Sequence, residues 1–130
     1  MLRKFLRCKL HGAIVSEANL EYEGSITIPP ELVKAAALAE GEKVLVVNVN
    51  TGARFETYVI VGRRARHVAL NGGAARCGEV GDRLLVLCFA LYDETEVARH
   101  KPNVFLLDGR NRIKRGTRKR PKRRGRPKRR

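Results

Sequence analysis

Short alternations of polar and apolar residues, separated by glycine, proline and asparagine, run through most of this chain. Residues 25–28 alternate as a half-buried strand does, and residues 44–49 are almost wholly aliphatic, as in a strand buried on both faces. The same criteria predict further strands at residues 5–15, with a break at His11-Gly12, and at residues 54–61, 68–70, 84–91 and 104–107.

Residues 31–38 form the one good helix candidate. Pro30 suits a first helical position, Glu31 places an acid in the first turn, and Gly41 follows as a stop. Six or more short strands, one or two short helices and frequent glycine turns predict a mainly β fold, closed or nearly closed into a barrel.

Length and cysteine content narrow the class of protein. A chain of 130 residues predicts a single domain. The three cysteines (Cys8, Cys77 and Cys88) are odd in number and widely spaced, which excludes a complete disulfide framework and any CxxC motif. The basic N-terminus does not read as a secretory signal, so we expect reduced thiols and a cytoplasmic location. No apolar run approaches the roughly 18 residues of a membrane span.

The net charge of +15 is concentrated at one end of the chain. Residues 110–130 hold 14 Lys and Arg and no acid, whereas in residues 1–109 the other 14 basic residues nearly balance 13 acidic ones. The sequence therefore predicts a near-neutral domain, residues 1–109, and a disordered basic tail, residues 110–130. This distribution argues against a uniformly basic nucleic-acid-binding domain.

The predicted domain lacks the usual catalytic signatures. It contains no GxSxG, no P-loop and no histidine pair at metal-ligand spacing, so no metal is expected. The peptide Gly24-Ser25 has a special chemistry when a fold strains it. The serine hydroxyl can attack the preceding carbonyl, which glycine leaves open, and elimination of the resulting ester followed by hydrolysis leaves a pyruvoyl group. Taken alone, Gly-Ser is more typical of an ordinary turn before a strand.

Motifs around this peptide change its interpretation, because several of them occur in order over residues 1–108. The chain resembles the aspartate 1-decarboxylase family, small pyruvoyl-dependent lyases that make β-alanine for pantothenate synthesis. The matching motifs are Lys9-Leu10-His11, Tyr22-Glu23-Gly24-Ser25, Asn50-Thr51-Gly52-Ala53-Arg54-Phe55 with Thr57-Tyr58, Asn71-Gly72-Gly73-Ala74-Ala75 with Cys77, Val80-Gly81-Asp82 and Pro102-Asn103-Val104.

The resemblance implies a precursor, or zymogen, that cleaves itself between Gly24 and Ser25. The products would be a β-chain, residues 1–24, and an α-chain, residues 25–130, that begins with a pyruvoyl group derived from Ser25. That group would form a Schiff base with L-aspartate and accept the electrons left when CO₂ departs, in place of pyridoxal phosphate. The resemblance also implies a six-stranded double-psi β-barrel and a homotetramer with active sites at subunit interfaces.

Roles for individual residues follow from the same resemblance. Tyr58 matches the proton donor, Arg54 a ligand of the substrate carboxylate, and Thr57 a residue beside the cleavage site. Lys9 and His11 match polar residues that line the pocket, and Asn71, Gly72, Gly73 and Ala74 match a loop whose backbone approaches the substrate. On a regular strand Arg54 and Tyr58 share one face, and Thr57 points the other way unless the strand bends.

Several features depart from the family pattern, among them Gly73, Val47, a shortened stretch at residues 62–66 and the basic tail. Gly73 stands where the family usually has alanine, and nothing in the family accounts for the basic tail. Within it, Arg124-Gly125-Arg126-Pro127 is similar to an AT-hook, which binds the DNA minor groove, although a polycation with nonspecific, salt-dependent affinity for phosphates is the simpler interpretation. The alternative function is therefore a noncatalytic barrel that associates with DNA through its tail.

Overall fold

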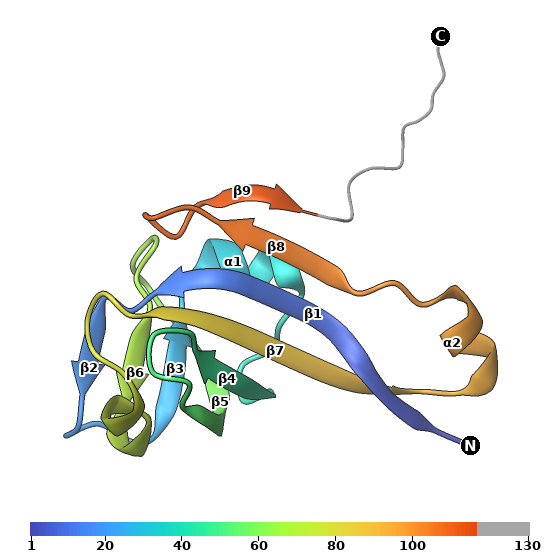
Figure 1. Cartoon of the computed structure of the whole chain (residues 1–130), viewed down its shortest axis with the longest axis horizontal. Helices are drawn as coiled ribbons and strands as arrows, with labels where there is room; N and C mark the ends of the chain where they lie inside the picture. Colours follow the sequence, from blue (N-terminus) through green and yellow to red (C-terminus); the bar gives the residue numbers. More distant parts are fainter. Residues whose placement is uncertain (117–130) are drawn as a thin grey trace, which may run out of the picture.

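The computed structural model describes residues 1–116, and these form one sheet of nine strands with two short α-helices and a 3₁₀ helix (Figure 1). The strand order is β2-β6-β3-β5-β4-β7-β1-β8-β9. The elements along the chain are β1 (Arg3–Ile14), β2 (Glu17–Asn19), β3 (Ser25–Ile28), α1 (Pro30–Ala36), β4 (Lys43–Asn48), β5 (Arg54–Val61), β6 (Ala69–Asn71), η1 (Gly72–Cys77), β7 (Arg83–Tyr92), α2 (Glu94–Arg99), β8 (Asn103–Leu107) and β9 (Ile113–Gly116).

Strands β1 and β7 are the longest, and they run side by side along the molecule as an antiparallel pair (Figure 1). Strand β1 also pairs in parallel with β8, so it lies inside the sheet. The break predicted at His11-Gly12 is a bulge in a continuous strand, where Gly12 adopts a φ of 97°. A second bulge lies between Leu6 and Cys8.

Helix α1 begins and ends through simple backbone chemistry. Pro30 occupies the first turn, where no N–H is needed, and Glu31 complements the helix dipole. Ala37 closes the helix in the left-handed conformation, one turn before the predicted stop at Gly41. The helix buries Leu32 and Ala36 against the sheet core.

The core is aliphatic and draws on almost every strand. The largest side chains with under 2% exposure are Leu10, Ile26, Ile28, Leu32, Leu70, Leu84 and several valines. Along β7 the buried Leu84, Val86 and Cys88 alternate with more exposed residues, whereas β6 is buried throughout. The core thereby fixes the positions of β3, β5 and β6, the strands that carry the predicted cleavage site and its neighbours.

The expected start of the disordered tail at Arg110 is wrong for residues 110–116. Asn111 is only 3% exposed, and its side chain accepts a hydrogen bond from the Ile14 N–H at 2.7 Å and donates to the carbonyls of Ile14 and Arg66. Residues 113–116 then form β9, paired with β8. The density of charge along the sequence does not reveal this role of Asn111, whose side chain forms hydrogen bonds with backbone groups of Ile14 and Arg66. The AT-hook-like stretch lies outside the described residues.

The prediction of a mainly β fold with short helices is confirmed. Over residues 1–116 the sheet has nine strands, compared with the six of the double-psi barrel that the resemblance implies. Seven of the nine match strands predicted from the sequence, and the short β2 and β9 were not predicted. Helix α2 was also missed, although Asp93 and Glu96 form a capping box. Barrel closure stays a prediction. Over the described residues, no helix is long and apolar enough to span a membrane.

Candidate active site

Ser25 begins β3 and is 1% exposed. Strand β3 lies between β5 and β6, and Ser25 faces Asn71 across the antiparallel β3–β6 pair. The Asn71 side-chain amide donates one hydrogen bond to Ser25 Oγ and another to Thr27 Oγ1, each 2.9 Å long. Ser25 Oγ donates in turn to the Glu23 carbonyl at 3.4 Å. A buried hydroxyl is thus held on two sides, next to the glycine whose carbonyl it is predicted to attack.

Gly72 packs directly against the backbone of Tyr22 and Gly24, just before Ser25. It opens η1 with a φ of 61°, and a Cβ at this position would lie 2.6 Å from both the Gly24 nitrogen and the Tyr22 carbonyl oxygen. Both contacts are with backbone, which has little room to move, so only glycine fits. Gly73 is different, because a Cβ there would meet nothing within 4 Å. The alanine usual in the family is therefore sterically compatible with this fold.

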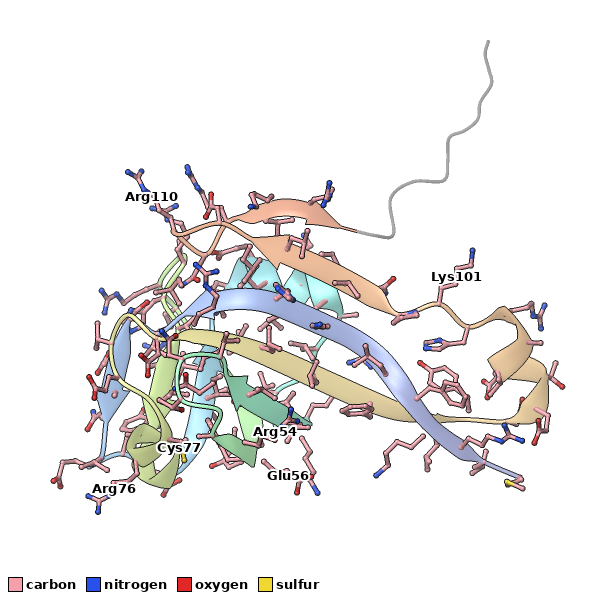
Figure 2. All side chains as sticks on the ribbon, viewed as in Figure 1. Arg54, Glu56, Arg76, Cys77, Lys101 and Arg110 are labelled. Carbon is pink, nitrogen blue, oxygen red and sulfur yellow. The ribbon has the colours of Figure 1, made fainter. Side chains whose placement is uncertain are left out.

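A cavity of about 360 Å³ opens beside Gly24. It brings together five of the residues predicted for the site: Gly24, Thr57, Tyr58, Gly73 and Ala74. Three further lining residues are Phe55, Glu56 and Cys77. Figure 2 shows Glu56 on β5 and Cys77 at the end of η1, in the same part of the molecule. The 71–74 loop and β5 therefore form two walls of one cavity beside the Gly24-Ser25 peptide.

Thr57 and Tyr58 both line this cavity although they are consecutive in β5. Tyr58 is 37% exposed, whereas Val59, which follows it, is fully buried. Strand β5 pairs with β4 through residues 54–58 and with β3 through residues 59–61, so the cavity lies where β5 passes from one neighbour to the other. Exposure alternates along residues 54–59 as in a regular strand, so Thr57 and Tyr58 lie on opposite faces of β5, and residues of both faces line the cavity.

Arg54, Lys9 and His11 do not line the cavity. Arg54 is the partner of Val47 in β4, Val47 is the partner of Leu85 in β7, and Leu85 is the partner of His11 in β1. Directly paired residues point to the same face of a sheet, so His11 and Arg54 lie on one face, three strands and about 14 Å apart. Lys9 lies two residues along β1 on that face. Figure 2 shows Arg54 at the end of the β4–β5 hairpin.

This second group is electropositive. Partial burial lowers the pKa of His11 below its usual value, and the charges of Lys9 and Arg83 lower it further. Among the ion pairs of residues 1–116, none involves Arg54 or Lys9, so both cations are available to an incoming carboxylate. The cations face outward on the sheet and are separate from the cavity within one copy of the chain.

Sequence reasoning did not select Phe55, Glu56 or Cys77 as site residues. Phe55 and Cys77 were quoted in the family motifs but given no role, and strand alternation places Glu56 on the face of Arg54 and Tyr58. Lys43 Nζ pairs with the Glu56 carboxylate at 3.2 Å, on the outward side of the hairpin. The exposed face beside Tyr58 therefore carries a Lys43–Glu56 ion pair.

The described residues contain no group of three or more His, Cys, Asp or Glu that could hold a metal ion. The cavity is lined by Thr57, Tyr58, the exposed Gly24 and the small residues Gly73 and Ala74, and the buried Ser25 directly follows Gly24 in the chain. A tyrosine at the cavity wall can deliver a proton to a bound substrate.

Comparison with known proteins identifies the family of this chain. The family model "Aspartate decarboxylase" matches residues 1–114. The chain is 52% identical over 113 residues to the aspartate 1-decarboxylase of Syntrophobacter fumaroxidans, covering 86% of this chain and 91% of that protein. It is 51% identical over 111 residues to that of Chlorobium limicola, covering 85% and 87%. The protein of this name from Bacillus cereus is 49% identical over 114 residues, covering 87% and 90%. The chain belongs to the aspartate decarboxylase family.

Proposed function

We propose that this protein decarboxylates L-aspartate to β-alanine and CO₂, as a step in pantothenate synthesis, with a pyruvoyl group generated from Ser25. Family membership supports the reaction. The observation that carries the site is the buried Ser25 hydroxyl, held by Asn71 beside a cavity that Gly24, Thr57 and Tyr58 line. Tyr58 and Thr57 are thereby close to the group that Ser25 would supply.

The first part of the mechanism is self-processing. Ser25 Oγ attacks the Gly24 carbonyl, its proton passes to the departing amide nitrogen, and the amide becomes an ester. Loss of the Ser25 Cα proton then breaks the ester C–O bond and releases residues 1–24 with a free carboxylate. The dehydroalanine left at position 25 takes up water and loses ammonia. Asn71 keeps the hydroxyl in place throughout, and Gly72 keeps the Gly24 backbone accessible.

In the second part the pyruvoyl group supplies an electron sink for the bond that breaks when CO₂ leaves aspartate. The Tyr58 hydroxyl then donates a proton to the substrate carbon. A phenol can serve as this donor because a carbanion is a much stronger base than a phenolate. Thr57 contacts the substrate from the same wall, and the small residues Gly73 and Ala74 let the backbone of η1 approach it.

Arg54, Lys9 and His11 act, in our proposal, from a second copy of the chain within a homotetramer. They lie outside the cavity of their own copy, on a sheet face that also presents the partly exposed Leu45, Leu85 and Leu87 and the 40% exposed Phe89. An apolar face of this kind suits an interface between copies. Arg54 can then pair bidentately with a substrate carboxylate across that interface.

The decisive measurement is the intact mass of the purified protein. We expect two chains that separate at Gly24-Ser25, with the larger one lighter by one ammonia than the same fragment carrying an N-terminal serine. Ser25→Ala should remain one chain and release no CO₂ from L-aspartate. A wild-type chain that stays whole on long incubation, or a Ser25→Ala variant that retains activity, would refute the proposal.

Tyr58→Phe separates the two parts of the mechanism. This variant keeps the ring but loses the proton donor, so we expect normal self-cleavage with kcat reduced about 10²- to 10⁴-fold. A variant that cleaves and turns over like the wild type would assign the proton to another group. Loss of cleavage would place the hydroxyl in processing instead.

We also propose that the basic C-terminal segment contacts nucleic acid nonspecifically. Arg110, Arg112, Lys114 and Arg115 are exposed at the start of it. Removal of residues 117–130 should abolish DNA retention at low salt, and retention by the shortened chain would contradict this. The three free cysteines support a reducing, cytoplasmic location.

A further inference from the structure

Two buried cysteines lie directly opposite each other in the centre of the sheet. Cys8 of β1 and Cys88 of β7 are paired across the antiparallel ladder, and each is 1% exposed. Both are free thiols, and both belong to the main apolar core. The proposed decarboxylation uses neither of them, because the cavity beside Gly24 is lined by a different cysteine, Cys77.

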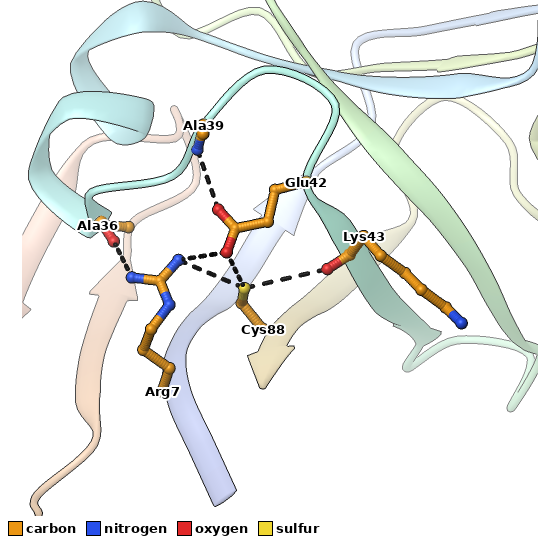
Figure 3. Close-up of polar contacts among 6 residues, drawn as sticks. All are labelled: Arg7, Ala36, Ala39, Glu42, Lys43 and Cys88. Atoms are coloured by element: carbon orange, nitrogen blue, oxygen red, sulfur yellow. Dashed lines mark hydrogen bonds and ion pairs between the residues drawn. The ribbon is translucent and has the colours of Figure 1, made fainter. Parts of the chain in front are cut away.

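An ion pair between Arg7 and Glu42 contacts the Cys88 sulfur. Arg7 is the extra residue of the bulge in β1, and its Nη2 donates to Cys88 Sγ at 3.4 Å. The same nitrogen forms an ion pair with Glu42 Oε2 at 2.9 Å, and Cys88 Sγ donates to that oxygen at 3.2 Å. Arg7 Nη1 also donates to the Ala36 carbonyl at 3.4 Å, which fixes the guanidinium to the end of α1 (Figure 3).

These contacts make the two thiols chemically unequal. The hydrogen bond from the Cys8 thiol to the Cys88 sulfur lowers the pKa of Cys88, and the positive Arg7 lowers it further, against burial and Glu42. The same hydrogen bond, together with burial, raises the pKa of Cys8. A thiolate is far more nucleophilic than a thiol, so Cys88 is the reactive member of the pair and Cys8 its protonated neighbour.

The backbone geometry permits a bond between them. Directly opposed residues of an antiparallel pair have Cα atoms about 4.5–5.5 Å apart. A disulfide spans Cα separations of about 4.4–6.8 Å. As directly paired residues, Cys8 and Cys88 point to the same face of the sheet, and both side chains lie in the apolar core. The strand register therefore places the two residues within the range of Cα separations that a disulfide spans.

We propose that Cys8 and Cys88 form a reversible thiol–disulfide site that hydrogen peroxide oxidises. The Cys88 thiolate attacks one peroxide oxygen, the O–O bond breaks, and the departing hydroxide takes a proton, which leaves a sulfenic acid on Cys88 and one water. The Cys8 sulfur then attacks the Cys88 sulfur, and the displaced hydroxide takes the Cys8 proton as a second water. Two thiols and one peroxide thus give one disulfide and two waters.

Access to the pair is through the ion pair that covers it. The side chains of Arg7 and Glu42 are 22% and 29% exposed, so the cover reaches solvent although the sulfurs do not. Peroxide is close to water in size, so small movements of the Arg7 and Glu42 side chains would admit it more readily than a bulky thiol reagent. The site should therefore react with peroxide before it reacts with large alkylating reagents, whereas Cys77, which is partly exposed, should react with both.

The bond would join β1 to β7, and residues 1–24 to the remainder of the chain. Peptide mapping of the oxidised protein without reduction detects it whether or not the chain has been cleaved at Gly24-Ser25, so failure of the proposed function leaves this test intact. In a cleaved sample the same bond would also hold the two fragments together on a nonreducing gel.

The experiment treats the reduced full chain with hydrogen peroxide, blocks remaining thiols and maps peptides by mass. We expect a linked pair containing Cys8 and Cys88, two hydrogens lighter than the separate peptides, that dithiothreitol separates. Cys77→Ser is the matched control and should form the same link. Arg7→Met should slow the link by roughly 3- to 10-fold, as the thiolate fraction of Cys88 falls.

Three results would overturn the proposal. One is the recovery of both thiols unmodified when Cys77 has already been oxidised. Another is the formation of sulfinic or sulfonic acid at Cys88 while Cys8 stays free. The third is a link that always includes Cys77. The main test uses only the wild-type protein and Cys77→Ser. It therefore does not require that Cys8 or Cys88 can be replaced by serine in the core.

Discussion

Asn71 and Ser25 face each other across the β3–β6 pair, and the Asn71 amide donates to the serine hydroxyl at 2.9 Å. Because the contact is buried, its loss leaves a polar group unsatisfied, at a cost of about 1–3 kcal/mol. We expect Asn71→Ala to slow self-cleavage roughly 10- to 100-fold, followed by intact mass over time. Asn50→Ala, which removes the same side chain from a distant turn, should cleave at the wild-type rate. Equal rates in all three proteins would remove Asn71 from processing.

Gly72 and Gly73 are neighbours with opposite tolerance for a side chain. Gly72→Ala would place a methyl group 2.6 Å from backbone atoms of Tyr22 and Gly24, at a positive φ. We expect destabilisation of at least about 2 kcal/mol and slow cleavage. Gly73→Ala is the matched control for stability, since its methyl group meets nothing within 4 Å. Thermal unfolding compares the two, and equal midpoints would contradict this account.

His11 should titrate below its usual pKa of about 6.5, because partial burial, Lys9 and Arg83 all disfavour its cation. The native state then binds fewer protons than the unfolded state below that pH. The contribution of neutral His11 to the free energy of unfolding is therefore complete above about pH 6.5. It is lost as the pH falls toward and through the lower pKa that His11 has in the native state. Lys9→Gln should raise the His11 pKa, measured by NMR titration.

Lys34→Gln, on the exposed side of α1, is the control for that titration and should leave the His11 pKa unchanged. A wild-type His11 that titrates at or above 6.5 would show that the cations do not act on it.

The position of a C-terminal truncation should matter. A chain that ends at Gly116 keeps β9 and Asn111, so its unfolding midpoint should equal that of the full chain. A chain that ends at Gly109 loses the three hydrogen bonds of the Asn111 side chain and the β8–β9 pairing. We expect the shorter chain to unfold several degrees lower. Equal midpoints for both truncations would show that β9 contributes no stability.

The sequence predicted much of the fold because strand alternation and turn residues are local signals. Residues 25–28 and 54–61 were predicted with the bounds that the structure has. Strand β2 was missed because its three residues are too short to show a period. Strand β9 was not predicted because its residues resemble the basic tail, and its order depends on pairing with β8 and on the distant partners of Asn111.

The sequence predicted only part of the site correctly as one cluster, because some of the predicted residues line the cavity and others lie elsewhere on the sheet. The family motifs identified Gly24, Thr57, Tyr58, Gly73 and Ala74, which the fold brings to one cavity. They also identified Arg54, Lys9 and His11, which lie elsewhere on the sheet. A motif records which residues a family retains and contains no information about which copy of the chain presents them. The pairing of Cys8 with Cys88 depends on strand register, which the sequence does not reveal.

Strand β1 lies between β7 and β8 and carries the buried Cys8, Leu10 and Ala13, so cleavage after Gly24 would not free the N-terminal piece. That piece would remain as an internal strand with no covalent link to its neighbours. An uncut chain folds in a unimolecular reaction, whereas the cut protein, once unfolded, would need two separate molecules to meet again. Denaturation of the mature enzyme should therefore become harder to reverse on dilution. The Ser25→Ala precursor should depend less on dilution, because the folding of each of its chains is unimolecular and only the assembly of copies is not.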